Sequence, residues 1–330
     1  MTAPLEVTSS EQSAEPEAVL VGMGRIQGRS LGQIAWMRLK RDRVAIAGGV
    51  VVVLLIVLAV AAPLLVKLFG HPPNEFHSSL IDPTFQRPKK SFGGIDLHFP
   101  LGVEPVNGRD VFSRILYGAR ISLLVAFLAT LLSVVIGTSL GIIAGFAGGW
   151  LDALISRTMD VFLAFPLLLF AIALGGVVQG KAFGLQGNSL RIGLLIFVIG
   201  FFNWPYIGRI IRGQTLSLRE GAYVDAARSL GARTPYILIR ELLPNLVAPI
   251  LVYSTLLIPT NILFEAALSY LGVGVQRPTP SWGGMLSDAV PYYSIDPMFM
   301  VVPGTAIFIT VLAFNLLGDG LRDALDPRAR

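Results

Sequence analysis

Long apolar runs recur along this chain at intervals typical of a membrane protein. Five runs contain no Asp, Glu, Lys or Arg, namely Val44 to Val66, Ile121 to Leu151, Val161 to Gly180, Ile192 to Gly208 and Pro297 to Gly318. A sixth run, Leu246 to Leu271, is interrupted only by Glu265. A helix needs about 20 apolar residues to cross a bilayer, and these runs lack the alternation of barrel strands. The pattern predicts an all-α polytopic membrane protein with six spanning helices.

The charged residues narrow the class of protein and predict its orientation. Only 14% of the residues are charged and 53% are hydrophobic, whereas a soluble domain carries about 25% charged residues. The absence of Cys excludes disulfides and thiolate zinc sites. Six basic residues precede the first run, namely Arg25, Arg29, Arg38, Lys40, Arg41 and Arg43. By the positive-inside rule they predict a cytoplasmic N-terminus, and six spans then place the C-terminus in the cytoplasm as well.

Together, the runs and the charges define the expected organisation of the chain. The predicted spans are residues 44–66, 121–147, 161–180, 192–208, 246–271 and 297–318. The predicted connections are an extracytoplasmic loop with an amphipathic helix at 67–120, a structured cytoplasmic loop at 209–245, an extracytoplasmic loop at 272–296 and a cytoplasmic tail at 319–330. Residues 1–29, rich in Glu, Ser, Thr, Ala and Pro, predict a disordered cytoplasmic tail. Residues 30–43 predict an interfacial helix anchored by Trp36 and basic side chains.

The loop at 209–245 is too long for a simple connection between helices, which commonly takes about 2–8 residues. An apolar stripe with helical spacing is formed by Tyr223, Ala226, Ala227 and Leu230. Gly231 is placed to end this helix, and Thr234-Pro235 to begin a second one that runs to Pro244. Two short helices joined at a glycine form a compact knob that suits the docking of another protein.

The same loop resembles the EAA loop of ABC importer permeases. The resemblance lies in Asp225-Ala226-Ala227, Gly231 and Leu243-Pro244, which have matching spacing. The sequence departs from the family pattern at Asp225, where Glu is usual, and at Glu241, where Ile is usual. A simpler role for Asp225 is an ion pair with Arg228 at i+3, and both roles can hold together.

Three further stretches resemble the C-type permease subunits of peptide and nickel importers, in the same order along the chain. They are Asn107 to Arg120, Ala267 to Gly283, and Asn315 to Arg328. Ahead of the first stretch, Leu101-Gly102-Val103-Glu104 stands where Leu-Gly-Thr-Asp is usual. The resemblance extends over residues 30 to 330.

This resemblance implies the six-span type I importer permease fold (MetI-like) in a bacterial inner membrane. It implies a non-catalytic subunit that forms half of a translocation path and couples it to ATPase subunits. The expected partners are a second homologous permease subunit, two ATPase domains that bind ATP and Mg²⁺, and an extracytoplasmic substrate-binding protein. No cofactor, metal or nucleic acid is expected on this chain. Oligopeptides or dipeptides are the expected substrate, and nickel chelates are the alternative. The residues implied in ATPase coupling are Tyr223, Asp225, Ala226, Ala227, Gly231, Leu243 and Pro244.

Other motifs favour simpler interpretations. The stretch from Gly175 to Ala182 lacks the final Ser or Thr of a P-loop, so we do not expect it to bind ATP. His71, His77 and His98 have no regular spacing and predict a solvated loop rather than a metal site. The helix, glycine, helix pattern lies between two spans, which argues against a DNA-binding motif.

Three residues inside the predicted spans are candidates for a path or gate. Pro205, close to Asn203, removes one helical hydrogen bond and predicts a kink, which bundle packing explains equally well. Glu265 is an intramembrane carboxylate, which either has a function or simply pairs near the end of its span. A secondary transporter would need several such groups in mid-span, and an intramembrane enzyme would need a catalytic cluster. The predicted spans contain neither.

Overall fold

The computed structural model describes residues 31–177, 181–182 and 184–325, so the predicted tail at 1–29 lies outside the described residues. The α-helices are α1 (Leu31–Leu39), α2 (Arg43–Phe69), α3 (Ser91–Gly94), α4 (Val111–Ala147), α5 (Gly149–Ala164), α6 (Leu167–Val177), α7 (Gly187–Leu218), α8 (Ala222–Ser229), α9 (Thr234–Tyr236), α10 (Leu243–Tyr270), α11 (Trp282–Ala289) and α12 (Pro297–Leu325). Short segments are the 3₁₀ turns η1 (Ser78–Leu80) and η3 (Val290–Tyr292) and the π-helical η2 (Ile237–Leu242). Strands β1 (Lys181–Ala182) and β2 (Leu185–Gln186) pair antiparallel.

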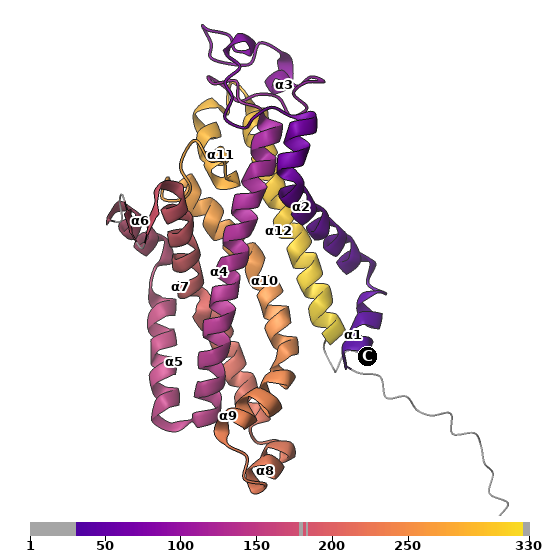
Figure 1. Ribbon diagram of the computed structural model, residues 1–330, viewed down its shortest axis with the longest axis vertical. Coiled ribbons are helices and arrows are strands. Elements are labelled where there is room, and N and C mark those ends of the chain that lie inside the picture. The colour runs from indigo at the N-terminus through magenta and orange to yellow at the C-terminus, as the bar shows by residue number, and fades with distance from the viewer. Residues whose placement is uncertain (1–30, 178–180, 183, 326–330) are drawn as a thin grey trace, which may run out of the picture.

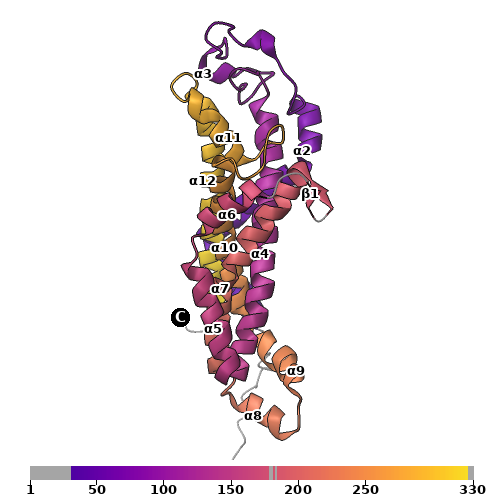
Figure 2. The same cartoon turned by 90° about the vertical axis from the view of Figure 1, so that its left-hand side faces the viewer.

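The long helices form an elongated bundle, and short elements gather at its two ends (Figures 1 and 2). We call one end the α3 end, where α3 and the segment 70–110 lie, and the other the α8 end, which carries α8 and α9. Within the described residues, five helices are long and apolar enough to cross a membrane, or up to six if a bent pair is counted as one span. The fold is therefore all-α and polytopic, as the apolar runs predicted.

The bent pair is α5 and α6, which meet at an angle of 76°. The break lies at Phe165, whose backbone is extended, immediately before Pro166. A proline disfavours helical geometry in the residue before it, which explains why the helix stops there. The sequence analysis treated 161–180 as one straight span, whereas the structure divides this region between two helices, and α5 begins much earlier, at Gly149.

Two other helices are longer than the apolar runs that predicted them. Helix α4 begins at Val111, because the Asp110 carboxylate accepts hydrogen bonds from the backbone amides of Phe112 and Ser113. Residues 111–120, assigned to a loop from the sequence, are therefore the first turns of α4. Helix α12 continues to Leu325, through most of the predicted tail at 319–330. Charged residues ended the apolar runs there, but they did not end the helices.

The most extensive helix contact lies between α4 and α7, and glycines spaced by four residues allow it. A Cβ atom on Gly137 would lie 2.6 Å from the Trp204 carbonyl oxygen, and one on Gly141 would lie 2.6 Å from the Gly208 carbonyl oxygen. Gly145 faces Thr215 in the same way. Small residues at this spacing let two backbones approach closely, which favours association of helices in a membrane.

Buried polar side chains connect the same helices across the bundle. The Asn203 amide of α7 donates to Asn261 Oδ1 of α10 at 2.8 Å, and the Asn261 amide donates to Thr130 Oγ1 of α4 at 2.8 Å. Ser133 of α4 donates to the Gly200 carbonyl oxygen at 2.7 Å. Interhelical hydrogen bonds in membranes contribute about 0.6 kcal/mol on average and up to about 2 kcal/mol. Helices α4, α7 and α10 are thus connected by direct hydrogen bonds.

We expect Gly141→Ala to destabilise the protein, since its new methyl group would meet the α7 backbone. Overpacking of this kind costs about 1–3 kcal/mol. The matched control is Gly213→Ala on α7, where a Cβ meets nothing within 4 Å, and where alanine should be neutral or stabilising by up to about 1 kcal/mol. Thermal unfolding in detergent measures both. Equal unfolding midpoints for the two variants would contradict the packing argument.

Candidate functional site

The knob predicted within residues 209–245 is present at the α8 end of the bundle (Figure 1). Helix α8 ends at Ser229, and Gly231 follows with a φ of +80°. The amides of Gly231 and Ala232 donate to carbonyl oxygens of the last turn, at 2.9 and 3.0 Å. The left-handed backbone at Gly231 satisfies these carbonyls, which is the physical reason for a glycine at this position.

Helix α8 buries one face and exposes the other. Val224 is fully buried and packs in a cluster with Ile237, Leu242 and Leu246. Tyr223, Ala226 and Leu230 of the predicted apolar stripe are exposed, Leu230 to 88%, and Ala227 is half-buried. Beside this stripe lies an open hollow of about 460 Å³, lined by Ala227, Leu230, Gly231, Ala232, Arg233, Tyr236 and Glu241. An apolar stripe exposed at the tip of a bundle is a candidate contact surface for another protein.

Charged side chains fix the knob to the bundle and surround its exposed stripe. Asp225 forms the i+3 ion pair with Arg228 at 3.2 Å. The Arg228 guanidinium also lies over the Phe146 ring at the end of α4, 5.3 Å from its centroid. Partial desolvation of the Tyr223 phenol against the knob, and secondarily the negative charge of Glu241, raise its pKa above the ordinary value. Tyr223 therefore stays a neutral hydrogen-bonding group at neutral pH.

The second helix of the knob differs from the sequence-based expectation. It begins at Thr234 with Pro235 in its first turn, as predicted, but its N-cap residue is Arg233. It does not end at Pro244, because α9, η2 and α10 follow one another without a break from Thr234 to Tyr270. Pro244 directly follows the π-helical η2, where the regular hydrogen-bond pattern of an α-helix is already interrupted. Leu243 and Pro244 are therefore part of the continuous helical path from the knob into the bundle.

Comparison with known sequences identifies the family of this chain. Residues 137–330 match the profile of the family described as binding-protein-dependent transport system inner membrane component. Residues 30–88 match the N-terminal transmembrane domain of oligopeptide transport permease C.

The chain belongs to this permease family.

Curated relatives align with the permease over nearly its whole length. The dipeptide transport system permease protein of Alkalihalophilus pseudofirmus is 40% identical over 296 residues, which cover 90% of each chain. The glutathione transport system permease protein of Pectobacterium atrosepticum is 40% identical over 295 residues, 89% of this chain and 90% of the relative. The glutathione permease protein of Escherichia coli O157:H7 is 41% identical over the same shares.

A solved structure shares the fold of the permease. It is the MetNI methionine ABC transporter in inward facing conformations, with a TM-score of 0.51 and 19% sequence identity. The similarity covers 64% of this chain and 96% of the other. The type I importer permease fold (MetI-like) expected from the sequence is thereby confirmed, with five spans, or up to six, among the described residues.

The three candidates for a path or gate are buried inside the permease itself. Asn203 bonds to Asn261, Pro205 lies within the uninterrupted helix α7, and Glu265 has no exposed surface. The Asn203 amide donates to Asn261 across the bundle, and Glu265 accepts a hydrogen bond from Ser269 at 2.8 Å. Their role in a path or gate stays a prediction.

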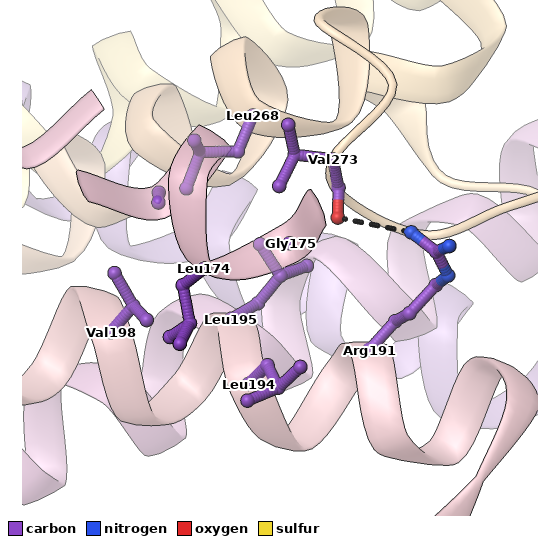
Figure 3. A pocket seen from close by; sticks show the side chains of 9 residues that line it. Leu174, Gly175, Arg191, Leu194, Leu195, Val198, Leu268 and Val273 are labelled. Carbon is purple, nitrogen blue, oxygen red and sulfur yellow. Dashed lines mark hydrogen bonds between the residues drawn. The ribbon is translucent and has the colours of Figure 1, made fainter. Parts of the chain in front are cut away.

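The remaining sequence candidates lack the geometry of a binding site. His71 and His77 pack against the Phe99 ring, and the described residues contain no group of three or more His, Asp or Glu arranged to hold a metal. The stretch from Gly175 to Ala182 lies only partly within the described residues. Near it, a cavity of about 20 Å³ is closed by Leu174, Val198 and Leu268 and by a long Arg191 hydrogen bond to the Val273 carbonyl (Figure 3). A cavity of this size holds roughly one water.

The sequence analysis missed a buried charge cluster at the α3 end. Arg109 and Arg114 both pair with Glu104, and all three side chains are almost fully buried. Arg114 also lies 3.9 Å from Asp288, which follows it by 174 positions in the chain. Glu104, Arg109 and Arg114 belong to the stretches that carry the family resemblance, whereas Asp288 does not, and spacing does not reveal their pairing across two loops. Buried charges require partners, and an arginine at the start of an apolar helix was the available signal.

Replacement of Gly231 tests the backbone argument at the knob. No atom lies within 4 Å of a Cβ at this position, so the penalty comes from the left-handed backbone alone, about 1–2 kcal/mol. We expect Gly231→Val to speed hydrogen exchange of the amides at 230–232 about tenfold, whereas Gly231→Asn should have little effect because Asn tolerates this backbone. Equal exchange in both variants would contradict the assignment.

Proposed function

We propose that this permease forms half of the translocation path of an ATP-driven importer and that its knob, residues 221–236, docks on an ATPase subunit. The observation that carries the proposal is the exposed apolar stripe of α8, with Leu230 exposed to 88% at the tip of the bundle. Because α9, η2 and α10 continue one another, a force on the knob acts directly on a helix that crosses the bundle. ATP-driven closure of the ATPase subunits would thereby bias the permease between two arrangements of its helices.

The permease itself has no catalytic role in this proposal. Two ATPase domains bind ATP and Mg²⁺ and hydrolyse ATP, a second homologous permease subunit completes the path, and an extracytoplasmic binding protein delivers the substrate. The α8 end lies in the cytoplasm, with both termini on the same side. This orientation is supported by the positive-inside rule, since the basic residues before the first span and the arginines of the 209–240 segment then share one side.

Peptides are the proposed substrate class. The support is that relatives named for dipeptide and for glutathione transport, both peptide substrates, are each about 40% identical to this chain over nine tenths of its length. Family similarity alone carries this assignment. In the proposal, the path forms between this chain and its homologous partner.

We expect Leu230→Asp to weaken ATPase binding, because a charge would replace an exposed apolar anchor. The matched control is Leu97→Asp at the α3 end, where the leucine is exposed to 99%. The tagged chain is purified from membranes in mild detergent, and the co-purified ATPase is identified by mass and assayed. Loss of an interface anchor costs about 2 kcal/mol or more, so retention should fall at least about tenfold. A chain that retains the ATPase equally in both variants would contradict docking at α8.

A further inference from the structure

Glu265 is a fully buried carboxylate in the upper part of α10, near the α3 end. No described cation forms an ion pair with Glu265. The groups that contact its carboxyl group are therefore neutral. Such an arrangement is costly in a protein interior unless hydrogen bonds replace the lost water. The groups that surround Glu265 therefore indicate what the carboxylate does.

Three serine hydroxyls from different parts of the chain converge on this carboxylate. Ser269 Oγ donates to Glu265 Oε1 at 2.8 Å, from one turn further along α10. Ser122 on α4 and Ser281 before α11 adjoin the same carboxylate, whose second oxygen, Oε2, has no hydrogen-bond partner among the described residues. A hydroxyl has one proton to donate and two lone pairs to accept with. Each serine that donates to Glu265 can therefore still accept a hydrogen bond from elsewhere.

Each of the three serines uses its oxygen to accept a backbone amide of the segment 275–284. The amide of Val275 donates to Ser269 Oγ at 3.4 Å, that of Trp282 to Ser122 Oγ at 3.3 Å, and that of Gly284 to Ser281 Oγ at 3.1 Å. Glu265 accepts the Ser269 proton, and the three hydroxyl oxygens accept from the loop. Glu265 thus lies beside three serines that hold three points of a segment with little regular structure before α11.

The segment 275–284 leads into α11, which packs into the α3 end of the bundle (Figure 1). We call α11 the plug. Trp282, Met285 and Ala289 of α11 are buried, and Trp282 packs in the cluster that contains Ala126 and Ile262. A Cβ on Gly283 would lie 2.4 Å from the Ala266 carbonyl oxygen, directly beside Glu265 in the sequence. Helix α11 therefore has almost no freedom to shift while the serine network is intact.

The far side of α11 is held by a second, ionic contact. Asp288 pairs with Arg277 at 2.6 Å and lies 3.9 Å from Arg114 of α4. Hydrogen bonding to Asp288 raises the pKa of the Arg277 guanidinium, so Arg277 stays charged at all ordinary pH values. Because the ionic contact lies in the outer loop and the serine network lies below it, the two can be tested separately.

We propose that Glu265 is a positioning residue that fixes α11 and the loop 275–284 through Ser122, Ser269 and Ser281. It acts as a hydrogen-bond acceptor and touches no substrate. Glu265 and the start of α10 at Leu243 lie on one helix, 22 residues or about 33 Å apart. The next step rests on the proposed function. If the knob docks on an ATPase subunit, α10 connects the plug at one end of the bundle to the knob at the other.

The first test measures the position of α11 directly. The chain has no Cys, so Met285→Cys introduces a single thiol at a site that is 1% exposed. Its labelling rate with a water-soluble maleimide is measured in membranes that contain the full chain and its partners. We expect E265A to raise this rate about tenfold, since it removes the acceptor of the buried Ser269 hydroxyl and leaves a cavity beside Ser122 and Ser281. E265Q keeps the volume and one acceptor oxygen, and its rate should stay closer to that of the parent.

Single serine replacements keep the test decisive if E265A does not fold. S281A and S122A each remove one bridge and should raise labelling about threefold. The matched control is S139A on α4, whose hydroxyl bonds only to the Val135 carbonyl of its own helix, and it should leave the rate unchanged. Unchanged labelling in S281A and S122A, equal labelling in E265A and E265Q, or an equal rise in S139A would each overturn the proposal.

The second readout separates this proposal from the proposed function. In the reconstituted complex, E265A should lower substrate uptake per ATP hydrolysed about fivefold or more, while ATPase retention at the α8 end stays at the parent level. If the parent complex shows no ATP-dependent uptake, the proposed function fails, whereas the labelling result stands by itself. A third outcome is that labelling rises while uptake per ATP hydrolysed is unchanged. Glu265 would then position α11, but the position of α11 would have no part in transport. That outcome overturns the proposed connection between the plug and the knob.

Discussion

The close approach of α4 to α7 is the contact on which the rest of the bundle depends. In a bilayer there is little hydrophobic gain from pairing two apolar helices, so association relies on close packing and on interhelical hydrogen bonds. Gly137 and Gly141 supply the first requirement, because their missing side chains are replaced by the α7 backbone. The second is met at Asn203, Asn261 and Thr130, which connect α10 to the same pair. The other spans pack around this core of three helices.

Polar residues inside the bundle connect its elements, both at the centre and near the α3 end. At the centre, side-chain amides connect helix to helix, and near the α3 end the Glu265 network connects helix to loop. Several of these hydrogen bonds join two different elements. Movement of one element against another therefore breaks hydrogen bonds. Such contacts favour a few discrete arrangements of the helices over continuous deformation. A path that opens alternately to the two sides of a membrane requires discrete arrangements of this kind. At the α8 end the opposite holds, because the α8 stripe is apolar and unoccupied within the described chain.

The sequence predicted the elements well where one local cause decides them, and poorly where distant residues do. The apolar runs predicted the spans, because the length of a run is a local property of the sequence. Gly231 predicted the end of α8, because the backbone preference of glycine is local as well. The start of α4 at Val111 was missed, since charged residues obscured a helix that Asp110 caps. The four-residue glycine spacing on α4 was readable but was not used. The pairing of Arg114 with Asp288, and the convergence of three serines on Glu265, depend on residues far apart in the chain, which spacing does not reveal.

The central claim is that this permease moves substrate only when ATPase subunits act on its α8 end. The most direct measurement is uptake of a labelled dipeptide into proteoliposomes that contain the complete complex and its binding protein, with ATP supplied only to the side that carries α8. The account predicts uptake that requires ATP and that is lost when the ATPase subunits are removed. Equal uptake by the permease without ATPase subunits, or without ATP, would contradict it.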